Sequence, residues 1–185
     1  MDVRARRWAC DSPVRVAGEC PNPHPWGDNG YRYCFCDAPV SDTDPGFDDS
    51  TMPSAAAPFT VNVNGCNYAG GGPHTTWNPQ QALFVRKTFA LAGIPTDARL
   101  HLAASPIVDV YLNGHWLCHM GQAECGTQDN LVIALPEFYL RAGSNVVAVQ
   151  AFGAGGSPVF DMAVTATGAV PTMKSSWGLL KARYR

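Results

Sequence analysis

The sequence carries little charge. Aspartate, glutamate, lysine and arginine make up 15% of its 185 residues, and the formal net charge is −2. So small a net charge gives no global attraction to nucleic acid or to an anionic membrane, so we expect neither as a partner. No apolar run approaches the length of about 18 residues that a membrane span requires. Residues 1–20 are basic but lack a continuous apolar stretch, so no secretory signal peptide is visible.

Motifs of common hydrolases and nucleotide-binding enzymes are missing as well. The chain has no Gly-x-Ser-x-Gly, no His-Glu-x-x-His and no glycine loop of the kind that cradles a phosphate. A glycosidase needs two carboxylates that flank one glycosidic bond, and Asp48 and Asp49 form an adjacent pair. Neighbouring residues on an extended chain point in opposite directions, so this pair cannot flank one bond. We therefore expect no enzymatic activity from this chain.

Glycine and proline are abundant instead, with 18 and 15 residues. Between them, short stretches alternate apolar and polar residues with a period of two, which is typical of strands with one buried face. In one such stretch Val108, Val110 and Leu112 should face a core, while Asp109, Tyr111 and Asn113 share the other face. A single helical turn fits residues 136–143. The stretches that we expect to be strands are 31–36, 59–65, 83–91, 99–105, 107–114, 131–136, 146–152 and 158–168.

Many short strands without an amphipathic helix between them predict an all-β fold, an antiparallel β-sandwich of the jelly-roll type. The alternation does not extend over the whole chain. Residues 1–44 are rich in cysteine and proline and predict an irregular N-terminal extension, and residues 45–168 contain the β-sandwich. Residues 169–185 are basic with an apolar stripe, which predicts a short C-terminal arm.

Four segments in order carry a family resemblance: "PGFDDSTMPSAAAP" (45–58), "ALFVRKTFAL" (82–91), "VDVYLNGHW" (108–116) and "LRAGSNVVAVQAF" (140–152). This pattern resembles the galactose-binding-like jelly roll, the sugar-binding domain of family 2 glycoside hydrolases and of related modules in phage tail and surface proteins. The resemblance implies a domain that binds or scaffolds. In the glycosidases of this family, the catalytic carboxylates lie in a different domain. Met52 departs from the family, which often has tryptophan there.

Seven cysteines are many for a chain of this size. Cys118 and Cys125 bracket a loop short enough for a disulfide to close. Four others could pair two by two, which leaves Cys66 odd: Cys10, Cys20, Cys34 and Cys36. Free thiols and a zinc site with His24 are the alternatives, although the cysteine spacings miss the usual zinc knuckle. Disulfides predict an oxidising location, either extracellular or on a virion surface.

Two groups of residues are candidates for carbohydrate binding, which uses an aromatic ring against the sugar and planar polar groups for its hydroxyls. Both lie in loops, and loops from distant hairpins of a jelly roll can meet at one rim. The alternative is that each tryptophan packs against its own domain. The first group is Trp116 with His115, His119, Gln122 and Asn130; the second is Trp77 with Tyr68, His74 and Asn78.

An acidic loop is a candidate for a structural calcium ion, which modules of the resembled fold often carry. Its carboxylates, which are hard oxygen ligands of the kind that calcium prefers, belong to Asp42, Asp44, Asp48 and Asp49. The alternative is a solvated loop with turn-forming aspartates. No other cofactor is expected.

These observations favour a non-enzymatic structural or adhesive component of an extracellular assembly. Trp8 and Trp26 near one end, and the basic arm at the other, could anchor such a protein to copies of itself or to other subunits. A phage tail or capsid accessory protein is the concrete version. The alternatives are a free-standing carbohydrate-binding module and an accessory sugar-binding domain of a glycosidase.

Overall fold

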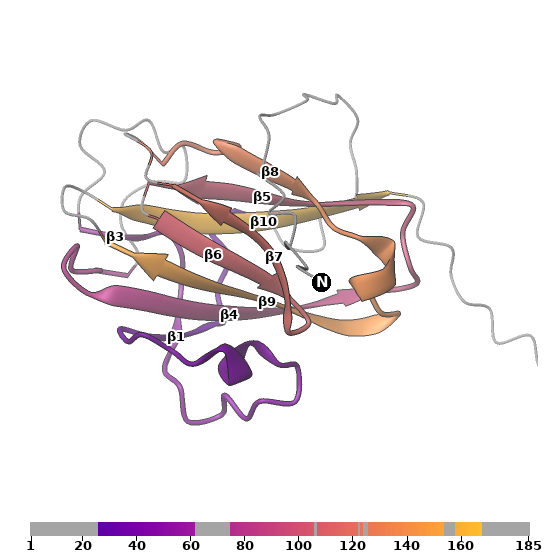
Figure 1. Cartoon of the computed structure of the whole chain (residues 1–185), viewed down its shortest axis with the longest axis horizontal. Coiled ribbons are helices and arrows are strands. Elements are labelled where there is room, and N and C mark those ends of the chain that lie inside the picture. The colour runs from indigo at the N-terminus through magenta and orange to yellow at the C-terminus, as the bar shows by residue number, and fades with distance from the viewer. Residues whose placement is uncertain are drawn as a thin grey trace, which may run out of the picture.

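The computed structural model describes residues 26–61, 75–105, 107–121, 123, 126–153 and 158–167. These residues form two sheets of antiparallel strands in two stacked layers (Figure 1). The larger sheet has the order β2-β1-β4-β9-β6-β7 and the smaller one β3-β10-β5-β8. The predicted all-β sandwich is therefore confirmed. The strands are β1 (Tyr31–Cys34), β2 (Ser54–Ala55), β3 (Phe59–Thr60), β4 (Ala82–Leu91), β5 (Asp97–Ala104), β6 (Ile107–Leu112), β7 (His115–Met120), β8 (Leu131–Ala134), β9 (Gly143–Phe152) and β10 (Val159–Thr167).

Two short 3-10 helices complete the described secondary structure, η1 (Val40–Thr43) and η2 (Glu137–Tyr139). The second is the helical turn expected within residues 136–143. Each helix begins directly after a proline in extended conformation, Pro39 and Pro136. Proline favours a helix start at this point, because its φ is fixed near the helical value and the residue before it is kept out of the helical conformation. Neither helix is long and apolar enough to cross a membrane, and these are the helices of the described residues.

The core lies between the two sheets and consists of the apolar positions predicted by alternation. On β6, Val108, Val110 and Leu112 are fully buried, while the residues between them are partly exposed. Burial of each such side chain contributes about 1.5–3 kcal/mol. Leu100 and Leu102 on β5 meet them from the opposite layer, in the same buried cluster.

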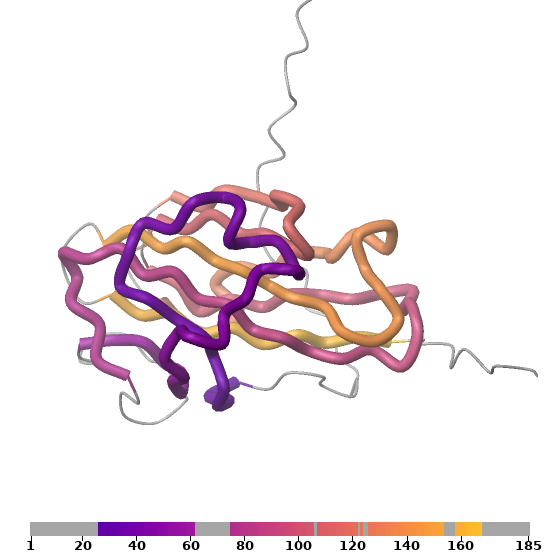
Figure 2. The backbone as a smooth tube through the Cα atoms, turned by 90° about the horizontal axis from the view of Figure 1, so that it is seen from below, coloured from indigo at the N-terminus to yellow at the C-terminus, as the bar shows by residue number. Residues whose placement is uncertain are grey.

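β9 from Asn145 onward and β4 as far as Lys87, at the centre of the larger sheet, are buried on both faces. Residues 35–53 cover their outer side, and Figure 2 shows this part of the chain lying across the strands. The Gln150 side chain on β9 fastens it there: Nε2 donates to the Cys36 carbonyl oxygen at 3.0 Å, and Oε1 accepts from the Ala38 backbone N–H at 3.1 Å. Coverage on two faces explains why β9 is almost continuously apolar instead of alternating.

The sandwich begins earlier in the chain than the predicted boundary at residue 45. β1 pairs with β4 in the larger sheet, and Tyr31 at its start is fully buried. The Tyr31 hydroxyl donates to Asp161 Oδ1 at 2.8 Å and is within 3.1 Å of the Met162 carbonyl oxygen. The Gly27 backbone N–H donates to the other Asp161 oxygen at 2.8 Å. Part of the segment assigned to an N-terminal extension is therefore integral to the fold.

Some strand boundaries differ from the expected ones. The stretch 31–36 is a strand only as far as Cys34, and the stretch 59–65 is described as a strand over Phe59–Thr60, with its remainder beyond residue 61 outside the described residues. β7 was not expected as a strand, because the sequence following Asn113 and Gly114 does not alternate regularly. The proposed C-terminal arm, residues 169–185, also lies outside the described part of the chain.

Candidate functional site

The outer face of β6 and β7 presents polar and aromatic side chains to solvent. Asp109 on β6 is opposite His119 on β7, and Tyr111 is opposite Trp116. Opposite residues of antiparallel strands project to the same side of a sheet. We call these four residues the β6–β7 face. Trp116 is 38% exposed, so part of its indole ring is available to a ligand.

A β-bulge brings Trp116 to this face. In a regular strand Trp116 would point to the same side as Cys118, which is buried opposite Val110. The pairing of β6 with β7 instead shifts between Val110 and Tyr111, so that Leu117 is the extra residue and Trp116 becomes the partner of Tyr111. Bulges redirect side chains in this way at the edges of sheets, and β7 is an edge strand.

Asp109 holds the polar part of the face together. Its Oδ1 is 3.0 Å from His119 Nδ1, and it also accepts a long hydrogen bond of 3.5 Å from Trp116 Nε1. Because a carboxylate only accepts hydrogen bonds, His119 Nδ1 carries the proton of this contact. In the neutral ring Nε2 is then an acceptor.

Tyr111 stays protonated on this face well above neutral pH. Burial raises the pKa of its hydroxyl above the ordinary value, and the negative charge of Asp109 raises it further. Both effects disfavour the phenolate. The hydroxyl of Tyr111 can therefore donate or accept a hydrogen bond beside the Trp116 ring.

The face has a border on one side and is open on the other. Asp109 is the pairing partner of Gln150 on β9. The Gln150 side chain is hydrogen-bonded to residues 36–38, which cover this part of β9. On the far side β7 ends the sheet. The ligand would therefore lie beside the covering segment and over the two outermost strands.

The hairpin that joins β6 to β7 is rigidly held. Asn113 has a positive φ of 50° and Gly114 one of 83°, the conformation that tight hairpins favour. Asn113 is buried, its Nδ2 donates to the Tyr139 carbonyl oxygen at 2.7 Å, and its Oδ1 accepts from the Val146 backbone N–H at 2.9 Å. These bonds tie the hairpin to η2 and β9, so the β6–β7 face rests on a fixed scaffold.

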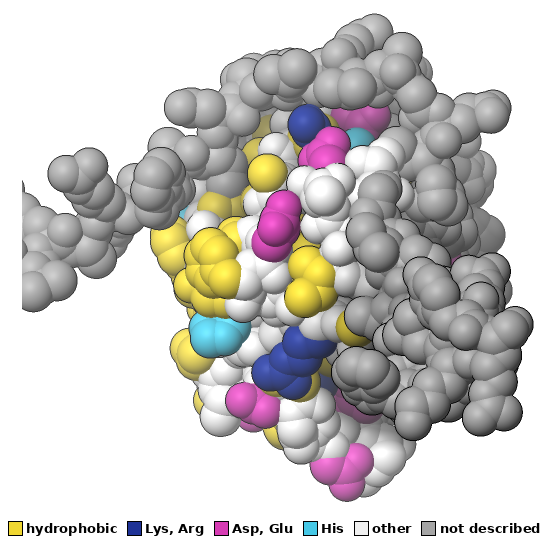
Figure 3. Space-filling model, turned by 90° about the vertical axis from the view of Figure 1, so that its right-hand side faces the viewer, with side chains coloured by type: hydrophobic (Ala, Val, Ile, Leu, Met, Phe, Trp, Pro, Cys, Tyr) yellow, Lys and Arg dark blue, Asp and Glu magenta, His cyan; other side chains and the backbone are white. Residues whose placement is uncertain are grey.

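His115 does not join the other residues of its predicted group. It is paired with Leu112, which faces inward, and its ring stacks on Tyr139 with centroids 4.1 Å apart. Figure 3 shows the end of the sandwich that lies on the right in Figure 1, where hydrophobic, acidic, basic and histidine side chains are interspersed.

The two described members of the second predicted group, Trp77 and Asn78, do not meet the first group at one rim. Trp77 is completely buried, and its Nε1 donates to the Gln81 carbonyl oxygen at 3.0 Å. This corrects its assignment as a ligand-facing ring: Trp77 is a core residue. Asn78 is exposed nearby, and its Oδ1 accepts from the Gln80 backbone N–H at 3.0 Å. This loop adjoins the Phe152 end of β9, whereas the β6–β7 hairpin adjoins the opposite end near Val147.

Of the four remaining members of the two groups, the structure describes only Asn130. Asn130 is structural: its Oδ1 accepts from the Ala104 backbone N–H at 2.9 Å, and its Nδ2 donates to the Ala104 carbonyl oxygen at 2.6 Å. Tyr68, His74 and Gln122 lie outside the described residues.

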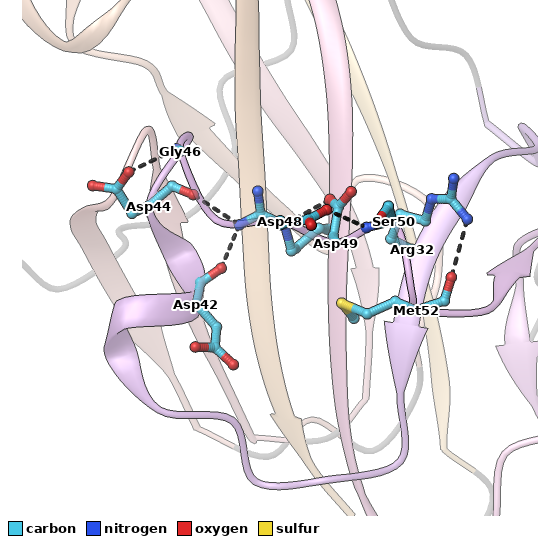
Figure 4. Close-up of polar contacts among 9 residues, drawn as sticks. Arg32, Asp42, Asp44, Gly46, Asp48, Asp49, Ser50 and Met52 are labelled. Atoms are coloured by element: carbon cyan, nitrogen blue, oxygen red, sulfur yellow. Dashed lines mark hydrogen bonds and ion pairs between the residues drawn. The ribbon is translucent and has the colours of Figure 1, made fainter.

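The acidic loop surrounds a cation, but that cation is an arginine of the protein. Arg86 on β4 is 2% exposed, and its Nε donates to Asp49 Oδ2 at 2.9 Å. Its Nη1 donates to the carbonyl oxygens of Asp42 and, at 3.1 Å, of Asp44. The guanidinium lies 5.2 Å from the centre of the Phe47 ring. Figure 4 shows the two carbonyl oxygens converging on one nitrogen.

Two other carboxylates of this loop form turns and the Asp42 carboxylate accepts from the Ser41 hydroxyl at 3.1 Å, which corrects the calcium expectation. Asp44 Oδ1 accepts from the Gly46 backbone N–H at 2.7 Å and Asp48 Oδ1 from that of Ser50 at 3.0 Å. The Ser50 hydroxyl and N–H lower the pKa of Asp48. Among the described residues no three His, Cys, Asp or Glu side chains gather where they could hold a metal ion. The loop fits the alternative of turn-forming aspartates.

The structure describes three of the seven cysteines, Cys34, Cys36 and Cys118. Cys34 and Cys36 form a disulfide, with Cα atoms 5.3 Å apart. Cys118 is also disulfide-bonded, and its expected partner Cys125 lies outside the described residues, as do Cys10 and Cys20. The described disulfide adjoins the segment that Gln150 fastens to the larger sheet.

Comparisons with known proteins identify the fold. Models of protein families give no match to the sequence, and no curated protein matches it. A solved structure of a glycosyl hydrolase family 2 member from Bacteroides cellulosilyticus is similar with a TM-score of 0.56 at 14% identity, over 79% of this chain and 21% of that one. A β-glucuronidase from glycoside hydrolase family 2 is similar with a TM-score of 0.51 at 16% identity, over 80% of this chain and 18% of that one.

This likeness confirms the resemblance to the β-sandwich of family 2 glycoside hydrolases at the level of the fold. The chain spans about a fifth of the length of these enzymes. Neither structure supports the interpretation as a phage tail or capsid protein.

Sequence reasoning placed Asp109 and Tyr111 on an outer face but gave them no role in a site. The alternation of β6 was the available signal, since it separates these residues from the buried valines. Their pairing with His119 and Trp116 depends on the bulge in β7, for which the sequence carries no clear signal.

Proposed function

We propose that this chain is a non-catalytic carbohydrate-binding domain that acts as an accessory sugar-binding domain of a glycosidase, with the β6–β7 face as its binding site. The observation that carries the proposal is the exposed indole ring of Trp116 beside Asp109 and His119. An aromatic ring packs against the apolar side of a sugar, and the carboxylate and imidazole accept hydrogen bonds from its hydroxyls.

The rigidity of the face supports this function. Weakly held side chains would lose conformational entropy on binding, and pre-organisation reduces that loss. Here Asp109 links His119 and Trp116 through hydrogen bonds, and the hairpin beside them is fixed by Asn113. The similarity of the fold to a domain of longer family 2 enzymes supports an accessory role.

The carboxylate content of the face supports binding without catalysis. β6, β7 and β9 carry one carboxylate between them, Asp109. Hydrolysis of a glycosidic bond uses two, one on each side of the bond. A ligand on this face would be held and not cleaved.

A glycan array followed by calorimetry tests the proposal. We expect micromolar to millimolar binding of at least one glycan, and a loss of tenfold or more in Trp116→Ala, which corresponds to about 1.4 kcal/mol. The matched control is Phe138→Ala, because Phe138 is an aromatic residue with 80% of its surface exposed and lies on η2, not on β6 or β7. Binding that survives Trp116→Ala, or that Phe138→Ala weakens equally, contradicts the assignment of the site.

The structural or adhesive assembly component is the competing function. It predicts a large oligomer by light scattering of the full chain, which disperses when residues 1–25 or 171–185 are removed. Those two truncations leave the described sandwich intact. A monomeric full chain that binds a glycan through Trp116 contradicts the assembly function.

A further inference from the structure

We infer that the β6–β7 face selects sugars by charge: amino sugars bind best, neutral sugars less tightly, and uronates are excluded. This inference rests on the proposed function and adds the class of ligand. It depends on which hydrogen-bonding groups the face offers and on the sign of the charge around them.

Asp109 and His119 form the pair at the centre of the face, and their polar atoms that are not used in contacts with the protein are hydrogen-bond acceptors. Asp109 Oδ1 is occupied by His119 and Trp116, which leaves Oδ2 without a protein partner in the described part of the chain. His119 Nδ1 carries the proton toward Asp109, so Nε2 accepts in the neutral ring. Trp116 Nε1, which can only donate, is turned toward Asp109. The sugar must therefore supply the donors at this point.

Asp109 gives the face a negative charge that no lysine or arginine on the same strands offsets, because none of the lysines and arginines in the described residues lies on β6, β7 or β9. Arg86 and Lys87, on β4, are paired with Asp49 and Asp28 at 2.9 Å each. The others are on β1, on β5 and in the connection between η2 and β9: Arg32, Arg99 and Arg141. The Asp109 charge also acts on its neighbour Tyr111, whose raised pKa depends in part on it.

Each substituent of a sugar would meet this negative charge differently. An ammonium group brings three donors and a positive charge, and charge-assisted hydrogen bonds are about twice as strong as neutral ones. A hydroxyl brings one donor without charge. A carboxylate brings no donor and repels Asp109, and juxtaposed like charges are strongly unfavourable at an interface. The order of affinity follows from these three cases.

The experiment uses an array on which each glycan backbone is present as neutral hexose, as 2-amino-2-deoxy-hexose and as uronate, followed by calorimetric titration of the backbone that gives a Trp116-dependent signal. At pH 7 an amine of this kind is largely protonated. We expect the amino sugar to bind about tenfold more tightly than the neutral one, and the uronate at least tenfold more weakly. The preference for the amine should shrink with added salt, because salt screens exposed charges.

The variant Asp109→Asn tests whether the Asp109 charge causes the order of affinity among the three sugar forms. We expect it to reduce the ratio of amino to neutral affinity to about twofold and to admit the uronate. Glu137→Gln is the matched control, since it removes the same charge from an exposed position on η2 and should leave the ratio unchanged. Equal affinities for the three forms, or equal effects of the two variants, overturn the inference while Trp116-dependent binding still supports the proposed function. Absence of any Trp116-dependent binding overturns both.

Discussion

His119 Nδ1 lies 3.0 Å from Asp109 Oδ1, across the two outermost strands of the larger sheet. The two residues are direct pairing partners, so the backbone ladder as well as the side-chain contact sets their distance. More than half of the His119 side chain is nevertheless exposed. The contact thus orients groups that face solvent, which is what a binding surface requires and what a buried core pair would not provide.

Replacement of His119 by alanine should weaken glycan binding more than it weakens the fold. Asp109 loses the group that orients its carboxylate, and we expect a three- to tenfold loss of affinity by calorimetry. An exposed polar contact of this kind contributes less than about 1 kcal/mol to stability, so the unfolding free energy should change little. His115→Ala is the matched control, because His115 stacks on Tyr139 away from the face. Equal loss of binding in both variants would show that His119 has no special role.

The ionisation of Tyr111 should report the charge of Asp109. Its pKa is raised by burial and by Asp109, so Asp109→Asn should lower it part of the way toward the ordinary value of about 10. Ultraviolet absorbance of the phenolate during a pH titration measures this, with Tyr111→Phe subtracted. Tyr111 contributes stability below that ordinary value, and the contribution is lost as pH rises through the raised folded value. An unchanged titration in Asp109→Asn would contradict the proximity of the two groups.

The sandwich could be predicted because its signal is repeated locally along the chain. The alternation that buries Val108, Val110 and Leu112 is visible within β6 alone, and the register of the sheet confirms it. The orientation of Trp116 could not be predicted in the same way. It depends on one unpaired residue, Leu117, and a strand without the bulge would have turned the indole ring toward the core.

The role of the acidic loop could not be predicted for a different reason: the residue that it binds, Arg86, is distant in sequence. Four aspartates within a few residues indicate either a metal site or turns, and both fit the composition. The deciding residue is Arg86, which is 37 positions away from the Asp49 that it contacts. The pairing of β1 with β4, together with the Gln150 hydrogen bonds to Cys36 and Ala38, brings this region of the chain over the arginine. The sequence of the loop contains no information about that cation.

Arg86→Ala should destabilise the protein by about 3 kcal/mol, the usual scale for removal of one partner from a buried ion pair. The substitution leaves Asp49 without its cation and two carbonyl oxygens of the loop without their donor. Chemical denaturation measures the change. Arg99→Ala serves as the control, since Arg99 pairs with Asp97 at the surface and its loss should cost less than about 1 kcal/mol. Equal effects of the two substitutions would contradict the buried role of Arg86.

Calcium should not stabilise this protein through the acidic loop. The Asp49 carboxylate is engaged by Arg86, and those of Asp44 and Asp48 accept backbone hydrogen bonds. We expect the thermal midpoint to be the same in millimolar calcium and in excess chelator. A rise of several degrees with calcium that Asp48→Asn abolishes would restore the loop as a metal site.

Trp77 and Trp116 should respond to alanine substitution in opposite ways, because one ring is buried and the other faces solvent. Trp77→Ala removes a complete core side chain and should lower the unfolding free energy by about 3–5 kcal/mol. Trp116→Ala should lower it by less than about 1 kcal/mol and remove glycan binding. Denaturant titration of both variants, with Trp77→Phe as a milder core change, makes the comparison. If Trp116→Ala were the more destabilising of the two, its ring would be a packing element of the sandwich, and the β6–β7 face would lose the aromatic surface on which a sugar is proposed to rest.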